Sequence, residues 1–148
     1  MSDKALELVY QFEKSKEDQA ANVLRQAQAH YQTNVDHLNG IGQYRLDYMK
    51  QLNERASSGV GGLTFGHYQN FIAKLDTAAT QQQQTIIAAK KVVEQRRQQW
   101  IKQQQKVKSV EILLAKKRAK VVAAESKQEQ KMFDEIAGQR FIRQQSTQ

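Results

Sequence analysis

No proline occurs among the 148 residues of this chain, and its absence permits helices far longer than those of most proteins. Proline in a helix interior costs about 3 kcal/mol, so a chain without it has few natural helix stops. The remaining residues are poor material for a compact core, because only 39% are hydrophobic and 16 of the 148 are alanine. Glutamine, with 24 copies, is the commonest residue. The composition therefore predicts an all-α protein of long and mostly exposed helices.

Several classes of protein do not fit this sequence. No apolar run reaches the roughly 18 residues of a membrane span, and residues 1–4 do not resemble the start of a signal peptide. The absence of cysteine excludes a disulfide framework and a thiol nucleophile, and it is compatible with the cytoplasm. Two of the three histidines, His30 and His37, lie about 10 Å apart along a helix, too far to share a metal. No phosphate-binding or nucleophile motif occurs, so we expect that the protein is not an enzyme and that it binds no metal and no cofactor.

Glycines divide the sequence at one place. Four of the seven glycines lie within residues 59–66, directly after two serines, and such a run ends a helix and reverses the chain. A long stretch without a comparable breaker lies on each side. We therefore expect a single coiled-coil domain, residues 1–148, with arm one at 3–56, a turn at 57–63, arm two at 64–143 and a short disordered tail at 144–148.

Both arms carry the apolar repeat of a coiled coil, here called the seam. In arm two, alternate steps of four and three residues from Tyr68 to Ala124 meet an apolar residue at 13 of 17 positions. In arm one, seven of ten such positions are apolar, and the ten are Leu24, Gln28, Tyr31, Val35, Leu38, Gly42, Arg45, Met49, Leu52 and Ala56. A strict heptad repeat predicts a left-handed coiled coil. We expect the two seams to face each other in an antiparallel two-helix hairpin and to satisfy each other within a monomer.

The hairpin leaves the end of arm two without a partner. A turn near residue 60 sets residue i opposite roughly residue 121 − i, so about 28 C-terminal residues overhang if both arms are continuous helices. Apolar residues continue in the overhang, at Met132, Phe133, Ile136, Phe141 and Ile142, and a separate apolar cluster lies at the same end, at Leu6, Leu8, Val9 and Phe12. Exposed apolar surface costs about 25 cal/mol per Å². We therefore predict that a partner covers this end; the alternative is a solvated extension.

A second apolar stripe runs beside the expected seam. It contains Ile41, Tyr44 and Tyr48 in arm one, and Phe71, Leu75 and Ala78 in arm two, with Gln82 continuing the spacing, and Leu75 is shared with the seam. A two-helix coiled coil buries only one seam, so these surplus residues predict a docking surface. The alternative is that the hairpin is wider here, or that a short extra helix from residues 57–67 packs on it.

Charge is distributed unevenly along the chain. Residues 1–62 carry a net charge of −1, from seven basic and eight acidic residues, and residues 63–148 carry +9, from sixteen and seven. Eleven basic residues lie within 90–120 against two acidic ones. Nucleic acid, anionic lipid or an acidic protein could meet such a surface. Because no nucleic-acid-binding module occurs, we favour an acidic protein partner or simple solvation over nucleic acid.

Several segments, in the same order along the chain, resemble proteins of the FliJ family, which are soluble components of the bacterial flagellar type III export apparatus. These segments are residues 5–12, 20–24, 38–48, 68–78 and 134–143. The resemblance implies an antiparallel coiled coil similar to the stalk of the rotary ATP synthase γ subunit. It also implies a place in the central hole of the hexameric export ATPase ring, whose assembly and activity the stalk promotes. Further partners implied are the cytoplasmic linker of the export gate protein and export chaperones, which the family helps to recycle.

The resemblance also suggests which residues contact these partners. The gate-binding positions fall on His37, Ile41, Tyr44, Tyr48, Phe71, Leu75, Ala78 and Gln82. The end expected inside the ATPase ring carries Leu6, Val9, Phe12, Met132, Phe133, Ile136, Arg140, Phe141 and Arg143. The implied location is the cytoplasm, at the inner membrane of the flagellar base through partners only. The alternatives are the equivalent stalk of a virulence secretion system and a general coiled-coil chaperone or scaffold.

Overall fold

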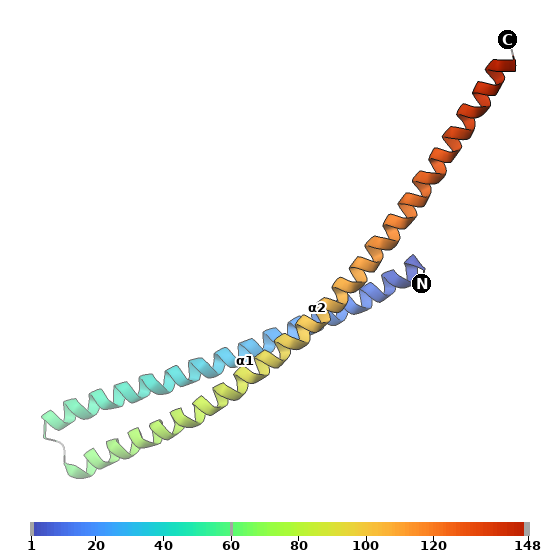
Figure 1. Cartoon of the computed structure of the whole chain (residues 1–148). Coiled ribbons are helices and arrows are strands. Elements are labelled where there is room, and N and C mark those ends of the chain that lie inside the picture. Colours follow the sequence, from blue (N-terminus) through green and yellow to red (C-terminus); the bar gives the residue numbers. More distant parts are fainter. Residues whose placement is uncertain (1, 60, 147–148) are drawn as a thin grey trace. The chain divides into compact units, whose positions relative to one another are not determined.

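The computed structural model of the chain describes residues 2–59 and 61–146 and contains two α-helices in these residues. Helix α1 is Asp3–Ser57 and helix α2 is Gly62–Ser146, and they pack against each other (Figure 1). No strand occurs in the part of the chain that is described. The prediction of an all-α helical hairpin is therefore confirmed.

The turn between the helices is shorter than predicted. Helix α1 includes Ser57 and helix α2 begins at Gly62, so both helices extend into the expected turn at 57–63. Gly59 has a φ of +84°, in the left-handed region that glycine adopts without a steric cost. The far end also differs from the prediction: residues 144–146, expected in a disordered tail, are helical, because glutamine favours a helix and no breaker precedes them. Residues 147–148 lie outside the described residues.

The chain divides into two compact units. Residues Asp18–Lys102 form one, here called the turn unit, which contains the turn and the adjoining halves of both helices. Residues 1–17 and 103–148 form the other, here called the open-end unit. Each unit contains a stretch of α1 and a stretch of α2, so each has its own seam.

The seam of α2 lies where the heptad repeat predicts it. In the turn unit, every predicted position from Tyr68 to Trp100 is buried or half-buried, and Ala89 and Val93 are the most buried. In the open-end unit, the same holds from Gln103 to Lys117. The strict repeat of seven thus keeps one stripe of α2 turned toward α1.

One of the two columns of the α1 seam is displaced by one residue from its predicted place. One column is buried or half-buried as predicted, and it contains Leu24, Tyr31, Leu38, Arg45 and Leu52. The other predicted column is exposed at Gln28, Gly42, Met49 and Ala56. The half-buried column is instead Ala27, Asn34, Ile41 and Tyr48. The prediction was wrong here because Ala27 and Asn34 give little apolar signal, although both positions face α2.

Two polar layers occupy equivalent places in the seam. In the turn unit, the Gln82 side-chain amide donates to the Asn34 backbone carbonyl at 2.9 Å and to its side-chain oxygen at 3.0 Å. In the open-end unit, the Gln103 amide donates to the Glu13 backbone carbonyl at 2.9 Å and to its carboxylate. Both pairs of residue numbers add to 116, so both units have the same pairing register. A hydrogen-bonded polar layer favours that register, because a slipped pairing leaves its buried groups unsatisfied.

The pairing ends near the start of α1, as the predicted overhang requires. The Arg118 guanidinium lies 3.1 Å from the Glu7 carboxylate, and the Lys117 ammonium lies 3.8 Å from that of Asp3. Every side chain of α2 from Arg118 to Gln145 is exposed. In the open-end unit, therefore, α2 continues as a single helix for about 40 Å past its last contact with α1.

Candidate functional site

The eight residues predicted to bind the gate all lie in the turn unit. They occupy two neighbouring heptad columns of each helix, at His37, Ile41, Tyr44 and Tyr48 of α1 and at Phe71, Leu75, Ala78 and Gln82 of α2. The two helices meet here through aromatic rings. The ring centroid of Tyr48 lies 4.2 Å from that of Phe71 and 5.9 Å from that of Tyr68. We call these eight residues the aromatic face.

Half of the aromatic face belongs to the seam itself. Ile41 and Tyr48 are half-buried seam residues of α1, and the seam of α2 contains Leu75 and Gln82. For Ile41 and Tyr48 the expectation of a surplus stripe beside the seam was wrong, because it rested on the displaced α1 column, whereas Leu75 and Gln82 already belonged to the predicted seam of α2. Residues 57–59 and 61–67 form the end of α1, part of the turn and the first turns of α2, with no separate helix among them.

The outward part of the aromatic face is narrower than predicted. Tyr44 is 63% exposed and Phe71 is 38% exposed, and His37 is exposed as well. Ala78 is half-buried beside them. These four positions follow one flank of the seam, so Tyr44 and Phe71 are the large apolar groups that a partner on this flank would contact.

Tyr48→Ala is expected to destabilise the protein by about 2 kcal/mol, because it removes a half-buried ring that touches Phe71 and Tyr68. Tyr44→Ala is the matched control and is expected to change the free energy of unfolding by less than about 0.5 kcal/mol. Urea unfolding followed by circular dichroism measures both. Equal losses for the two variants would contradict the assignment of Tyr48 to the core and Tyr44 to the surface.

The N-terminal residues predicted to contact the ATPase ring do not all face outward. Leu6 is 7% exposed, so it is a core residue of the open-end unit, and its place among exposed contact residues was wrong. A leucine at that heptad position packs toward α2. Val9 is half-buried. Phe12 is exposed, and the Lys16 ammonium lies 4.4 Å from the centre of its ring. Phe12 is thus the one large apolar group of this set that α1 presents to a partner.

The C-terminal members of the predicted ring-contact set lie on the unpaired part of α2. All are exposed, Phe133 by 70%, and they are Met132, Phe133, Ile136, Arg140, Phe141 and Arg143. Phe133, Ile136 and Phe141 line a shallow groove with Arg140, and two residues that the sequence reasoning missed, Ala137 and Gln144, complete it. These six share one face of a helix, at steps of three and four residues. The unpaired helix therefore has an apolar face for a partner, here called the overhang face.

The described residues hold no arrangement for metal chemistry. Within 2–59 and 61–146, no group of three or more His, Cys, Asp or Glu side chains could hold a metal ion. No helix in the same ranges is both long enough and apolar enough to cross a bilayer. The candidate site consists of two surfaces that could bind other proteins, the aromatic face in the turn unit and the overhang face in the open-end unit.

Comparison with known proteins gives one match. A family model described as the flagellar FliJ protein matches residues 2–146. No curated protein and no solved structure matches the chain. The family match covers both units and both candidate surfaces.

Proposed function

The chain belongs to the FliJ family and is thus a component of the flagellar export apparatus, and we propose that it acts there as the non-enzymatic central stalk of the export ATPase complex. In this role it promotes assembly and activity of the hexameric ATPase ring. It docks to the cytoplasmic linker of the export gate protein and helps to recycle export chaperones. It acts in the cytoplasm, at the inner membrane of the flagellar base through its partners.

The observation that carries the proposal is the unequal length of the two helices. Helix α2 runs past its last contact with α1 as a single helix, with Phe133, Ile136 and Phe141 on one face. Hiding such a face from water is favourable by about 25 cal/mol per Å². A ring that surrounds the helix would cover this face, whereas a hairpin that worked alone would gain nothing from it.

The second surface supports the proposal that the two units bind different partners. Tyr44 and Phe71 lie in the turn unit, and the overhang face lies in the open-end unit. No residue is shared between the two surfaces, so the protein can contact the gate and the ATPase at the same time. A stalk that connects the ATPase to the gate requires this separation.

The proposal is tested by adding the purified full-length chain to the purified export ATPase. We expect the rate of ATP hydrolysis to rise and the hexamer fraction in analytical ultracentrifugation to increase, with both effects reaching a plateau as the chain is added. An unrelated two-helix coiled coil of similar charge serves as the control. No change in either quantity would contradict the stalk role while leaving the family membership intact.

A further inference from the structure

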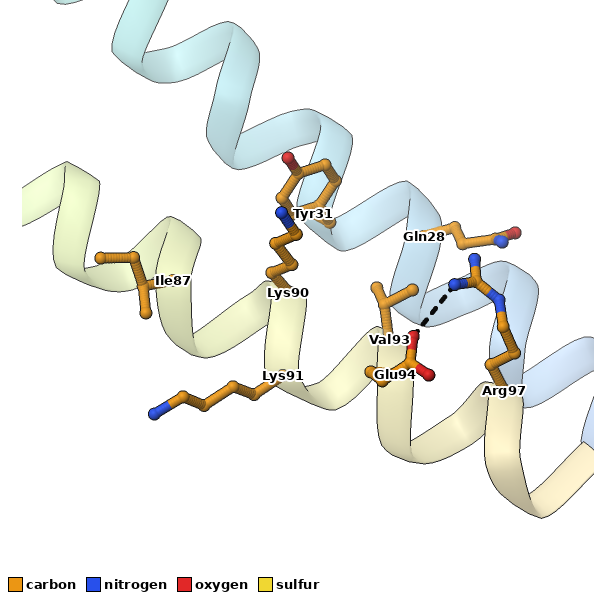
Figure 2. A pocket seen from close by; sticks show the side chains of 8 residues that line it. All are labelled: Gln28, Tyr31, Ile87, Lys90, Lys91, Val93, Glu94 and Arg97. Atoms are coloured by element: carbon orange, nitrogen blue, oxygen red, sulfur yellow. Dashed lines mark hydrogen bonds and ion pairs between the residues drawn. The ribbon is translucent and has the colours of Figure 1, made fainter.

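The turn unit has a groove that neither proposed partner surface uses. It holds about 620 Å³ and is formed by both helices, with Gln28 and Tyr31 from α1 and a run of α2 residues from Ile87 to Arg97 (Figure 2). Gln28 flanks the α1 seam on one side, whereas His37 and Tyr44 flank it on the other. The groove therefore lies on the flank of the turn unit opposite the exposed part of the aromatic face.

The floor of the groove is apolar. Val93 is a buried seam residue and Tyr31 is half-buried, so together they close the groove toward the seam. Ile87 lies outside the seam and is 50% exposed at the edge of the groove. Burial of this isoleucine by a partner is favourable, because half of its apolar surface is still in contact with water.

The rim of the groove is basic. Lys90, Lys91 and Arg97 line it together with one carboxylate, that of Glu94. The Arg97 guanidinium lies 3.0 Å from the Glu94 carboxylate, as the dashed line in Figure 2 marks, and the Gln98 amide donates to the same carboxylate at 3.1 Å. Among the described residues, no carboxylate lies within ion-pair distance of Lys90 or Lys91. The rim thus carries positive charge that the chain itself does not neutralise.

Some basic residues elsewhere in the two units have acidic partners on the other helix. In the open-end unit, Arg118 pairs with Glu7 at 3.1 Å, and Arg118 occupies the same heptad position as Lys90 and Arg97. Near the turn, Arg45 pairs with Asp76 at 2.6 Å. Beside the groove, α1 supplies the neutral Gln28 instead. Beside the groove, therefore, no carboxylate of the described α1 residues pairs with Lys90 or Lys91.

We propose that this groove binds an acidic amphipathic α-helix of a partner protein. An apolar floor between two helices accepts the apolar stripe of a third helix, and the unpaired lysines require carboxylates beside that stripe. A flat anionic membrane fits less well, because the apolar floor at Val93 and Tyr31 is recessed between the helices. The proposal goes beyond the stalk function and does not depend on it.

The geometry specifies the spacing of charges on the partner. Lys90 and Arg97 are seven residues apart, which is about 10 Å along the helix axis. A partner helix that follows the groove meets both when its carboxylates repeat every seven residues on one face, and at Arg97 the partner's carboxylate joins the existing ion pair with Glu94. Its apolar residues between the acidic positions then lie over Val93, and those before the carboxylate that meets Lys90 lie over Ile87. A helix of the same composition with its carboxylates on different faces cannot make both kinds of contact.

Two synthetic peptides of about 20 residues test this requirement, since a helix of that length, about 30 Å, is about twice as long as the groove. Both have the same composition of Leu, Ala and Glu. One carries its glutamates at intervals of seven beside a leucine stripe, and the other has them distributed around the helix. Fluorescence anisotropy with the full-length protein at about 0.15 M salt, where surface charges are screened beyond about 8 Å, measures both dissociation constants. We expect the first peptide to bind at least about tenfold more tightly.

Variants then locate the binding site on the protein. Lys90→Glu with Lys91→Glu is expected to weaken binding of the first peptide by about tenfold or more, and Ile87→Ser by several-fold. Lys106→Glu with Lys108→Glu has the same change in net charge on exposed residues of the open-end unit, and we expect it to change binding by less than about threefold. Circular dichroism checks that all variants remain helical. Equal binding of the two peptides, equal losses in the two charge variants, or binding to anionic vesicles but not to the first peptide would overturn the proposal.

Discussion

Deletion of residues 129–148 is expected to reduce stimulation of the export ATPase to background while the paired helices remain folded. The deletion removes the overhang face with Phe133, Ile136 and Phe141, which the proposed function places against the ATPase ring. It removes no packing with α1, because every α2 side chain from Arg118 to Gln145 is exposed. Steady-state ATP hydrolysis measures the loss, and thermal unfolding followed by circular dichroism measures the stability of the remaining hairpin.

A full-length variant separates the effect of the apolar face from the effect of chain length. Phe133→Ser with Phe141→Ser keeps all 148 residues and is expected to lose most of the stimulation, because both exposed rings leave the overhang face. Binding to the export gate is expected to persist in this variant and in the deletion. Loss of gate binding with stimulation retained would reverse the assignment of the two surfaces.

Tyr44→Ala combined with Phe71→Ala is expected to weaken binding to the export gate linker by about tenfold or more, as the loss of two aromatic anchors does at a protein interface. Both side chains are exposed on one flank of the turn unit, so the variant is expected to keep its helicity. Surface plasmon resonance against the purified linker measures the affinity. Stimulation of the ATPase serves as the control and is expected to be unchanged.

Tyr48 is left intact in that experiment because of its place in the structure. Its ring packs on Phe71 and Tyr68 across the helix pair, so Tyr48→Ala would confuse loss of folding with loss of a contact. Phe71 has both roles, and a variant with Tyr44→Ala alone shows how much of the effect is purely at the surface. If the double variant does not change gate binding, the aromatic face is not the docking surface for the gate.

Much of the fold could be predicted because α2 repeats its apolar residues without interruption. A seam made of residues such as Ile72, Ile86, Val93 and Val107 can be recognised from one helix alone. The glycines near residue 60 then fix the place of the turn, and the sum of paired residue numbers, 121 for Arg45 with Asp76 and 116 in the polar layers, lies within about five of the predicted 121. The length of the overhang follows from the same arithmetic.

The second column of the α1 seam could not be read in this way. Asn34 and Glu13 are polar, and they face the seam because Gln82 and Gln103 of α2 donate hydrogen bonds to them. A pattern that scores apolar residues on one helix cannot detect a polar layer whose partner lies on the other. The nearby Val35 and Met49 gave an apolar signal one residue away, and the predicted column followed it.

The candidate surfaces differ in the same way, because one is formed by a single helix and the others depend on how the two helices pair. The overhang face could be predicted from α2 alone, since helical spacing places Phe133, Ile136 and Phe141 together. The basic groove could not, because its floor and rim come from two helices and its charge is notable only where α1 offers Gln28 rather than a carboxylate. Which members of the aromatic face are exposed also depended on the pairing, as Tyr44 and Tyr48 show.

Hydrogen–deuterium exchange of the full-length chain, alone and with each partner, tests the division of labour between the two units most directly. The side chains of residues 119–145 are exposed and do not pack against α1, so the amides of this part of α2 are expected to exchange fast in the free protein. Addition of the export ATPase is expected to slow exchange in residues 129–146, and addition of the gate linker is expected to slow it around Tyr44 and Phe71. Protection by the ATPase confined to the turn unit, with residues 129–146 still exchanging fast, would contradict the account.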